Sequence, residues 1–197
     1  TMLAFAGIYK VNPAPRVLKA MQFIAEEALV EQNARSGGWM YRLPWGHCNC
    51  VSLEDRKKGI TPHVGEAGFI TSVRLNGLGR YYQLTGDKRI PNSLKRAVDN
   101  LNNDTWHDHL SGWRYTSCPA TARSVSQPGV TIMALVNSVS INKDGEQLRV
   151  LKKAWDFRFK DLLENPLTTR PGLGKTYSAT MYGAPEAMNL FINGEMD

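Results

Sequence analysis

"YYQLTGDKRIPNSLKRAV", residues 81–98, holds the end of one expected helix, a tight turn and the start of a second helix. Gly86 suits the left-handed position that commonly ends a helix, and Asp87 can cap the helix that follows. A turn this short reverses the chain and places the two helices side by side. The stretch therefore predicts an antiparallel helical hairpin.

The same kind of junction occurs twice more in the chain. Residues 8–24 read "IYKVNPAPRVLKAMQFI" and residues 139–155 read "VSINKDGEQLRVLKKAW". Pro13 and Pro15 punctuate the first copy, and Gly145 is the residue expected to take the left-handed position in the last one. Self-similarity of this kind predicts an array of stacked hairpins.

The helices on the two sides of each junction differ in character. Those after the turn carry an apolar stripe and a charged face, which is typical of helices on the outside of an array. These predicted outer helices are residues 16–32, 91–104 and 146–165. The helices before the turn are rich in small and apolar residues on several sides, which indicates burial. These predicted inner helices are residues 66–84, 129–141 and 177–192.

Long connections join each outer helix to the next inner helix. The first contains Gly38-Trp39-Met40-Tyr41 and the second Gly112-Trp113-Arg114-Tyr115, while residues 174–177 resemble a degraded third copy. All four histidines and all three cysteines of the chain fall in the first two connections. Reactive side chains gathered at one end of a rigid scaffold indicate where a site would be built.

Alternating inner and outer helices, with short turns at one end and Gly-Trp loops at the other, resemble the α/α-toroid proteins. The segment "RYYQLTGDKRI" is similar to junctions in six-hairpin glycosidases and polysaccharide lyases. The loops "GGWMYR" and "SGWRYTS" more weakly resemble terpenoid cyclase and prenyltransferase repeats. The resemblance implies an all-α fold of antiparallel hairpins forming part of an (α/α) toroid. We expect residues 1–197 to be one such domain, and we favour a fragment or C-terminal half of a longer chain. The alternatives are that the other half of the toroid belongs to a partner subunit or that it never existed.

The net charge of the chain indicates what kind of ligand it would bind. The chain has 24 Lys and Arg against 18 Asp and Glu, a formal charge of +6, which favours an acidic ligand. The basic residues are spread along the chain, and no apolar run reaches the length of a membrane span. We therefore expect an anionic or neutral glycan as partner, and neither nucleic acid nor a membrane.

The resemblance and the charge together predict a carbohydrate-active enzyme that acts on an acidic poly- or oligosaccharide. A lyase needs a base for the C5 proton of a uronate, an acid for the leaving oxygen and a group that neutralises the carboxylate. Tyr and His suit the first two roles and Arg suits the third. A hydrolase would instead need two facing carboxylates, for which Glu66 and Asp108 are available, although Glu66 could simply favour a helix N-terminus. The predicted catalytic residues are Tyr41, His63, Glu66, Asp108 and Tyr115.

Aromatic and basic residues of the same loops are candidates for binding the substrate, because aromatic rings stack on sugars and arginine pairs with acidic groups. For Trp39 and Trp113 the competing interpretation is packing between hairpins. The predicted substrate-binding residues are Trp39, Arg42, Trp45, Trp113, Arg114 and Arg123.

The stretch "HCNC" raises the question of a metal. His47, Cys48 and Cys50, with His63 or Cys118 as a fourth ligand, could form a tetrahedral zinc site. Cys-x-Cys is tighter than the usual spacing of zinc ligands, so the sequence favours free or buried thiols and no cofactor.

Two other classes of function stay open. A non-catalytic helical repeat that serves as a scaffold or binding module would bury its loop aromatics between hairpins and leave no open cleft. A terpenoid-cyclase-like enzyme is the third hypothesis, although the sequence lacks a visible acidic motif for that chemistry.

Overall fold

The computed structural model describes residues 1–44, 47, 48, 50–121, 128–164 and 181–193. The helices are α1 (Met2–Val11), α2 (Pro15–Glu31), α3 (Leu53–Lys57), α4 (Gly68–Thr85), α5 (Ile90–Thr105), the 3-10 turn η1 (Asp108–Leu110), α6 (Pro128–Asn142), α7 (Gly145–Glu164) and α9 (Ala184–Ile192). Two short antiparallel ribbons pair β1 (Tyr41–Arg42) with β2 (Val64–Gly65) and β3 (Trp106–His107) with β4 (Gly112–Trp113). The predicted all-α class is confirmed. Within these ranges, no helix is both long and apolar enough to cross a membrane.

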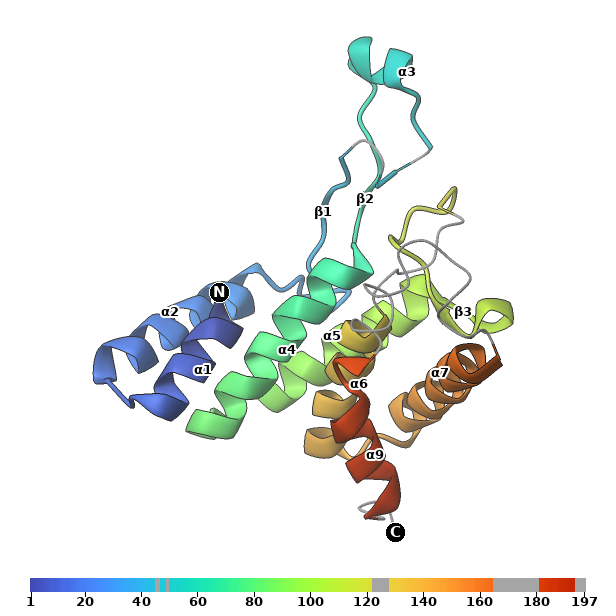
Figure 1. Ribbon diagram of the computed structural model, residues 1–197. Helices are drawn as coiled ribbons and strands as arrows, with labels where there is room; N and C mark the ends of the chain where they lie inside the picture. The colour runs from blue at the N-terminus through green and yellow to red at the C-terminus, as the bar shows by residue number, and fades with distance from the viewer. Residues whose placement is uncertain (45–46, 49, 122–127, 165–180, 194–197) are drawn as a thin grey trace.

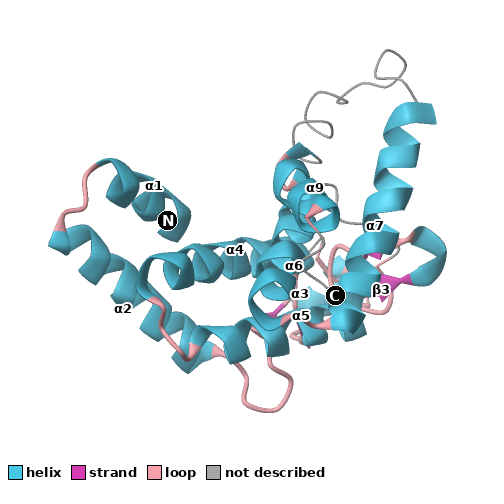
Figure 2. Cartoon of the chain, turned by 90° about the horizontal axis from the view of Figure 1, so that it is seen from below, coloured by secondary structure: helices cyan, strands magenta, loops and turns pink. Residues whose placement is uncertain are grey.

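The helices form an inner row and an outer row. Helices α1, α4, α6 and α9 contact one another in that order, while α2, α5 and α7 each pack beside the inner helix that precedes them in the chain (Figures 1 and 2). Buried positions occur around much of α4 and α6, whereas α2 buries only Met21, Ala25 and Ala28. The prediction is confirmed for the inner helices α4 and α6 and for the outer helix α2, whereas the predicted outer helix α5 buries as large a share of its residues as α4. The described part of the predicted inner helix 177–192 contains a turn at residues 182 and 183, and α9 begins only after it, at Ala184.

The short turns follow the prediction at one junction and depart from it at another. Gly86 ends α4 in the left-handed conformation, with φ of 66°. At the later junction Lys143 takes the left-handed position, with φ of 54°, so the prediction for Gly145 is wrong. The reason is that the Asp144 side chain accepts the backbone N–H groups of Glu146 and Gln147 as a helix cap, which makes Gly145 the first residue of α7.

The long connections lie at the end of the hairpins opposite to these turns. Residues 41–65, here called the arm, leave the helical layer along β1, pass through α3 and return along β2 (Figure 1). The second connection meets the base of the arm through a bridge between Ala67 and Thr116 and a bond from Ser117 N to the main-chain oxygen of Glu66, 2.9 Å. Two loops distant in sequence therefore meet along one line of main-chain contacts, between residues 66–67 and 116–117, here called the seam.

The two glycines of the turns should respond oppositely to substitution. We expect Gly86→Ala to lower the free energy of unfolding by about 1 kcal/mol, because an L-residue is strained at positive φ. Gly145→Ala should raise it by about 0.5 kcal/mol, because a Cβ there meets no atom within 4 Å and alanine restricts the unfolded chain. Urea denaturation of the two variants provides the measurement, and changes of the same sign would contradict the assignment.

Candidate functional site

A buried carboxylate lies at the base of the arm. The side chain of Glu66 is fully buried and accepts hydrogen bonds from Thr71 Oγ1 at 2.6 Å, Asn100 Nδ2 at 2.7 Å and Trp39 N at 3.4 Å. Burial raises the pKa of Glu66 above its usual range, and the hydrogen bonds from Thr71 and Asn100 oppose that rise. The carboxylate thus ties the first long connection to α4 and α5.

The loop before β1 can approach Glu66 only because it contains glycine. A Cβ at Gly38 would overlap Asn100 Nδ2 and lie 3.0 Å from Glu66 Oε1. This close approach fixes the backbone just before Trp39 and Tyr41. The glycine of the repeated Gly-Trp-x-Tyr pattern therefore has a packing function in the first copy.

The two tryptophans of the pattern are both buried. Trp39 is 6% exposed and donates its indole N–H to Ala28 O at 2.8 Å. Trp113 is 1% exposed, donates to Asn102 Oδ1 at 2.9 Å and meets Trp106 edge to face at 5.1 Å between ring centroids. An indole that is buried with its N–H satisfied has the geometry of a packing residue.

The tyrosines of the two copies lie on opposite sides of one histidine. Tyr41 Oη is 3.5 Å from His47 Nδ1, and Tyr115 Oη is 3.3 Å from His47 Nε2. All three side chains are half-buried. A neutral imidazole donates through one nitrogen and accepts through the other, so this arrangement can pass a proton between the two hydroxyl groups. Burial raises the pKa of Tyr41, and the neighbouring Tyr115 adds to that rise.

The main chain of His47 is also held. Thr116 donates its hydroxyl group to His47 O at 2.6 Å, and the Thr121 hydroxyl group lies 3.1 Å from that of Thr116. The imidazole is therefore positioned by the second connection, although it belongs to the first. Sequence reasoning gave His47 no catalytic role, because nothing local indicates that its ring would meet Tyr115, 68 residues later.

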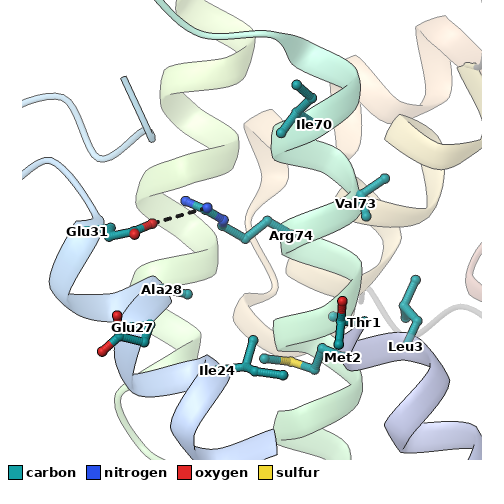
Figure 3. A pocket seen from close by; sticks show the side chains of 11 residues that line it. Thr1, Met2, Leu3, Ile24, Glu27, Ala28, Glu31, Ile70, Val73 and Arg74 are labelled. Atoms are coloured by element: carbon teal, nitrogen blue, oxygen red, sulfur yellow. Dashed lines mark ion pairs between the residues drawn. The ribbon is translucent and has the colours of Figure 1, made fainter. Parts of the chain in front are cut away.

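Tyr41 also lines an open pocket of about 500 Å³ with Glu31, Trp39, Met40, Ile70, Thr71 and Arg74. The Arg74 guanidinium group lies 5.0 Å from the centroid of the Trp39 ring and 3.2 Å from Glu31. Figure 3 shows Arg74 extending from α4 toward Glu31 on α2, in an adjoining pocket. Sequence reasoning missed Arg74, because Arg80 lies on the same helix and nothing in the residues around Arg74 indicates that its side chain would meet Trp39 and Glu31.

The remaining predicted catalytic residues have other surroundings. The His63 side chain is exposed, and its main-chain oxygen accepts from Leu43 N. Asp108 is exposed on η1, where it binds Lys153 at 2.7 Å and the Trp106 indole at 2.9 Å. Glu66 and Asp108 share no hydrogen-bond partner among the described residues.

The predicted arginines have different surroundings. Arg42 is exposed and, as the next residue on β1, points to the side opposite Tyr41. Arg114 donates to Asp104 O at 2.7 Å, and its buried Nε has no partner in the described part of the chain. Trp45 and Arg123 lie outside the described residues.

Three thiol groups come together beside His47. Cys50 Sγ lies 3.1 Å from Cys118 Sγ, which in turn lies 3.5 Å from Cys48 Sγ, and all three sulfur atoms are within 4.8 Å of one another. Cys48 and Cys118 are buried and Cys50 is exposed. The hydrogen bond with Cys118 raises the pKa of the Cys50 thiol. Such a group could hold a metal ion, with Cys118 rather than His47 as the third ligand.

In comparisons with known proteins, the chain matches no family model, and no curated protein or solved structure is significantly similar to it.

The raised pKa of Glu66 predicts a pH-dependent stability. The folded protein holds this proton more tightly than the unfolded chain, whose glutamate pKa is about 4.3, so stability falls as the pH rises from that value through the folded pKa. Glu66→Gln should remove this dependence, because the amide does not titrate and Asn100 can turn its oxygen toward it. Urea denaturation of both proteins at several pH values measures the difference.

Glu66→Ala serves as the contrasting variant. It leaves the Thr71, Asn100 and Trp39 donors without an acceptor, and we expect a loss of at least about 2 kcal/mol in the free energy of unfolding. A wild-type protein with the same pH slope as Glu66→Gln would contradict the raised pKa.

Proposed function

We propose that this chain is a hairpin array from an (α/α) toroid and belongs to a carbohydrate-active enzyme that cleaves an acidic poly- or oligosaccharide by elimination. The alternating inner and outer rows, with short turns at one end and long loops at the other, support the architecture. The observation that carries the activity is the His47 imidazole between the Tyr41 and Tyr115 hydroxyl groups, beside a pocket that also contains Arg74.

In the proposed reaction a uronate residue of the substrate enters the pocket. Arg74 pairs with its carboxylate, which makes the C5 proton easier to remove. A base from the cluster of Tyr41, His47 and Tyr115 takes that proton, the electron pair forms the C4=C5 double bond, and the C4–O bond breaks. The departing oxygen takes a proton from the same cluster, since His47 can carry a proton from one tyrosine to the other.

The positions of the carboxylates favour elimination over hydrolysis. Glycoside hydrolysis uses two carboxyl groups that flank the scissile bond. Both oxygens of Glu66 are already bonded in a fully buried position, and Asp108 is paired with Lys153 at the surface. Glu66 is therefore better suited to positioning the loop that carries Trp39 and Tyr41.

A non-catalytic binding module is the second candidate, and the burial of both tryptophans favours it. That burial leaves Arg74 and Tyr41 to contact a ligand in the pocket. In this case the chain would bind an acidic glycan without altering it, and the tyrosine hydroxyl groups would contribute to affinity alone.

Replacing groups of the cluster tests the reaction. We expect the full chain, together with its missing toroid half if it has one, to release unsaturated products from a uronate polymer, seen as ultraviolet absorbance of the new double bond. Tyr41→Phe and His47→Gln should each lower kcat about 100-fold or more, since each removes a group that transfers the proton.

Tyr82→Phe is the matched control, because Tyr82 lies in the last turn of α4, where its main-chain oxygen accepts from Gly86 N at the short turn. It should keep full activity. A Tyr41→Phe variant as active as the wild type would overturn the assignment of the cluster. Binding of uronate polymers without any unsaturated product would favour the binding module.

A further inference from the structure

The described residues of the arm form very little hydrophobic core of their own. Its two strands pair over two residues each, and α3 buries none of its residues. The small apolar cluster at its base consists of Leu43, Cys48 and Cys118, with Tyr41 packed against it. A segment with so small a core usually needs a disulfide or a metal ion to hold one conformation.

We propose that Cys48, Cys50 and Cys118 bind a zinc ion that fastens the base of the arm to the second long connection. The two cysteines of the arm are joined by a third that lies 68 and 70 residues further along the chain. A metal ion at this point would cross-link the two connections that also form the Tyr41, His47 and Tyr115 cluster.

The sulfur positions fit a tetrahedral ion closely. A Zn–S bond of about 2.3 Å and a tetrahedral angle place sulfur atoms about 3.8 Å apart. The observed separations of 3.1 and 3.5 Å, with all three atoms within 4.8 Å, require adjustments of less than about 1 Å. Such adjustments are within the reach of cysteine side-chain rotation.

The ligand set selects the class of metal. Thiolates are soft ligands that favour zinc over magnesium or calcium, and each cysteine releases its thiol proton when the metal binds. Among the described residues, the cluster comprises these three ligand atoms, and Cys50 is the exposed member. A solvent molecule takes the fourth position on that side.

The surroundings hold the ligand loops in place without competing for the metal. Arg56 on α3 donates to Cys48 O at 2.9 Å, which fixes the main chain at this ligand. Both ring nitrogens of His47 face tyrosine hydroxyl groups, so this histidine is not a ligand despite its place in "HCNC". The exposed His63 lies outside the cluster.

Cobalt substitution tests the site directly. The full chain is reduced, stripped with a chelator and titrated with Co²⁺, whose bonds to thiolates give charge-transfer absorbance. We expect one Co²⁺ per chain and its displacement by an equivalent of Zn²⁺. Cys50→Ser should weaken Co²⁺ binding at least about 10-fold and remove part of this absorbance, because an exposed ligand is lost with little effect on packing.

His47→Gln and His63→Gln are the matched controls and should bind Co²⁺ as the wild type does. The thermal midpoint of the zinc-loaded wild type should fall on adding a chelator, and that of Cys50→Ser at the same zinc concentration should fall less, because weaker binding contributes less stabilisation. Three outcomes would overturn the proposal: reduced wild type without charge-transfer absorbance, Cys50→Ser with wild-type affinity, or a Cys50–Cys118 disulfide in protein purified with Zn²⁺ present.

Discussion

The buried carboxylate of Glu66 is the constraint on which the loop end of the molecule depends. An acidic group removed from water must be matched by donors, and here they come from three separate elements: Trp39 in the first connection, Thr71 on α4 and Asn100 on α5. The Glu66 side chain is fully buried, so water cannot replace any of these hydrogen bonds. The loop before β1 is therefore held in one position relative to the helices. That position requires a glycine at residue 38 and brings Tyr41 to the edge of the pocket.

The main chain of Glu66 also takes part in the seam between the two loops. Its backbone N–H binds Ser117 Oγ at 2.8 Å, and its main-chain oxygen accepts from Ser117 N at 2.9 Å. One residue thus fixes both the helix side and the loop side of the seam. The tyrosine and histidine cluster and the three thiols lie along the same seam, so the proposed reaction and the proposed metal site depend on a common framework.

Much of the helical architecture could be predicted because its signals are local. The apolar stripe of residues 16–32 and the turn at Gly86 each depend on neighbours within a few positions, and both predictions agree with the structure. Where local signals competed, prediction was less reliable: Asp144 and Gly145 both suit the last turn, and the capping bonds of Asp144 decided the register.

The site was only partly predictable. Burial of Trp39 and Trp113 was one of two interpretations that the residues allowed, and a tryptophan gives the same signal in a loop whether it faces a ligand or a neighbouring helix. Residue spacing could not predict that Arg74 lies over the Trp39 ring or that the His47 ring meets Tyr115. Both contacts are made with residues on other elements.

By itself, the sequence determined an all-α array of hairpins and which end carries the reactive side chains, because helical periodicity and turn chemistry act over a few residues. Only the tertiary structure decided that Tyr41 and Tyr115 flank His47, that Cys118 joins Cys48 and Cys50, and that Glu66 is buried. The contact of His47 with Tyr115 and those of Cys118 with Cys50 and Cys48 join residues 68 to 70 positions apart. They arise from how neighbouring hairpins stack, and no local pattern encodes that geometry.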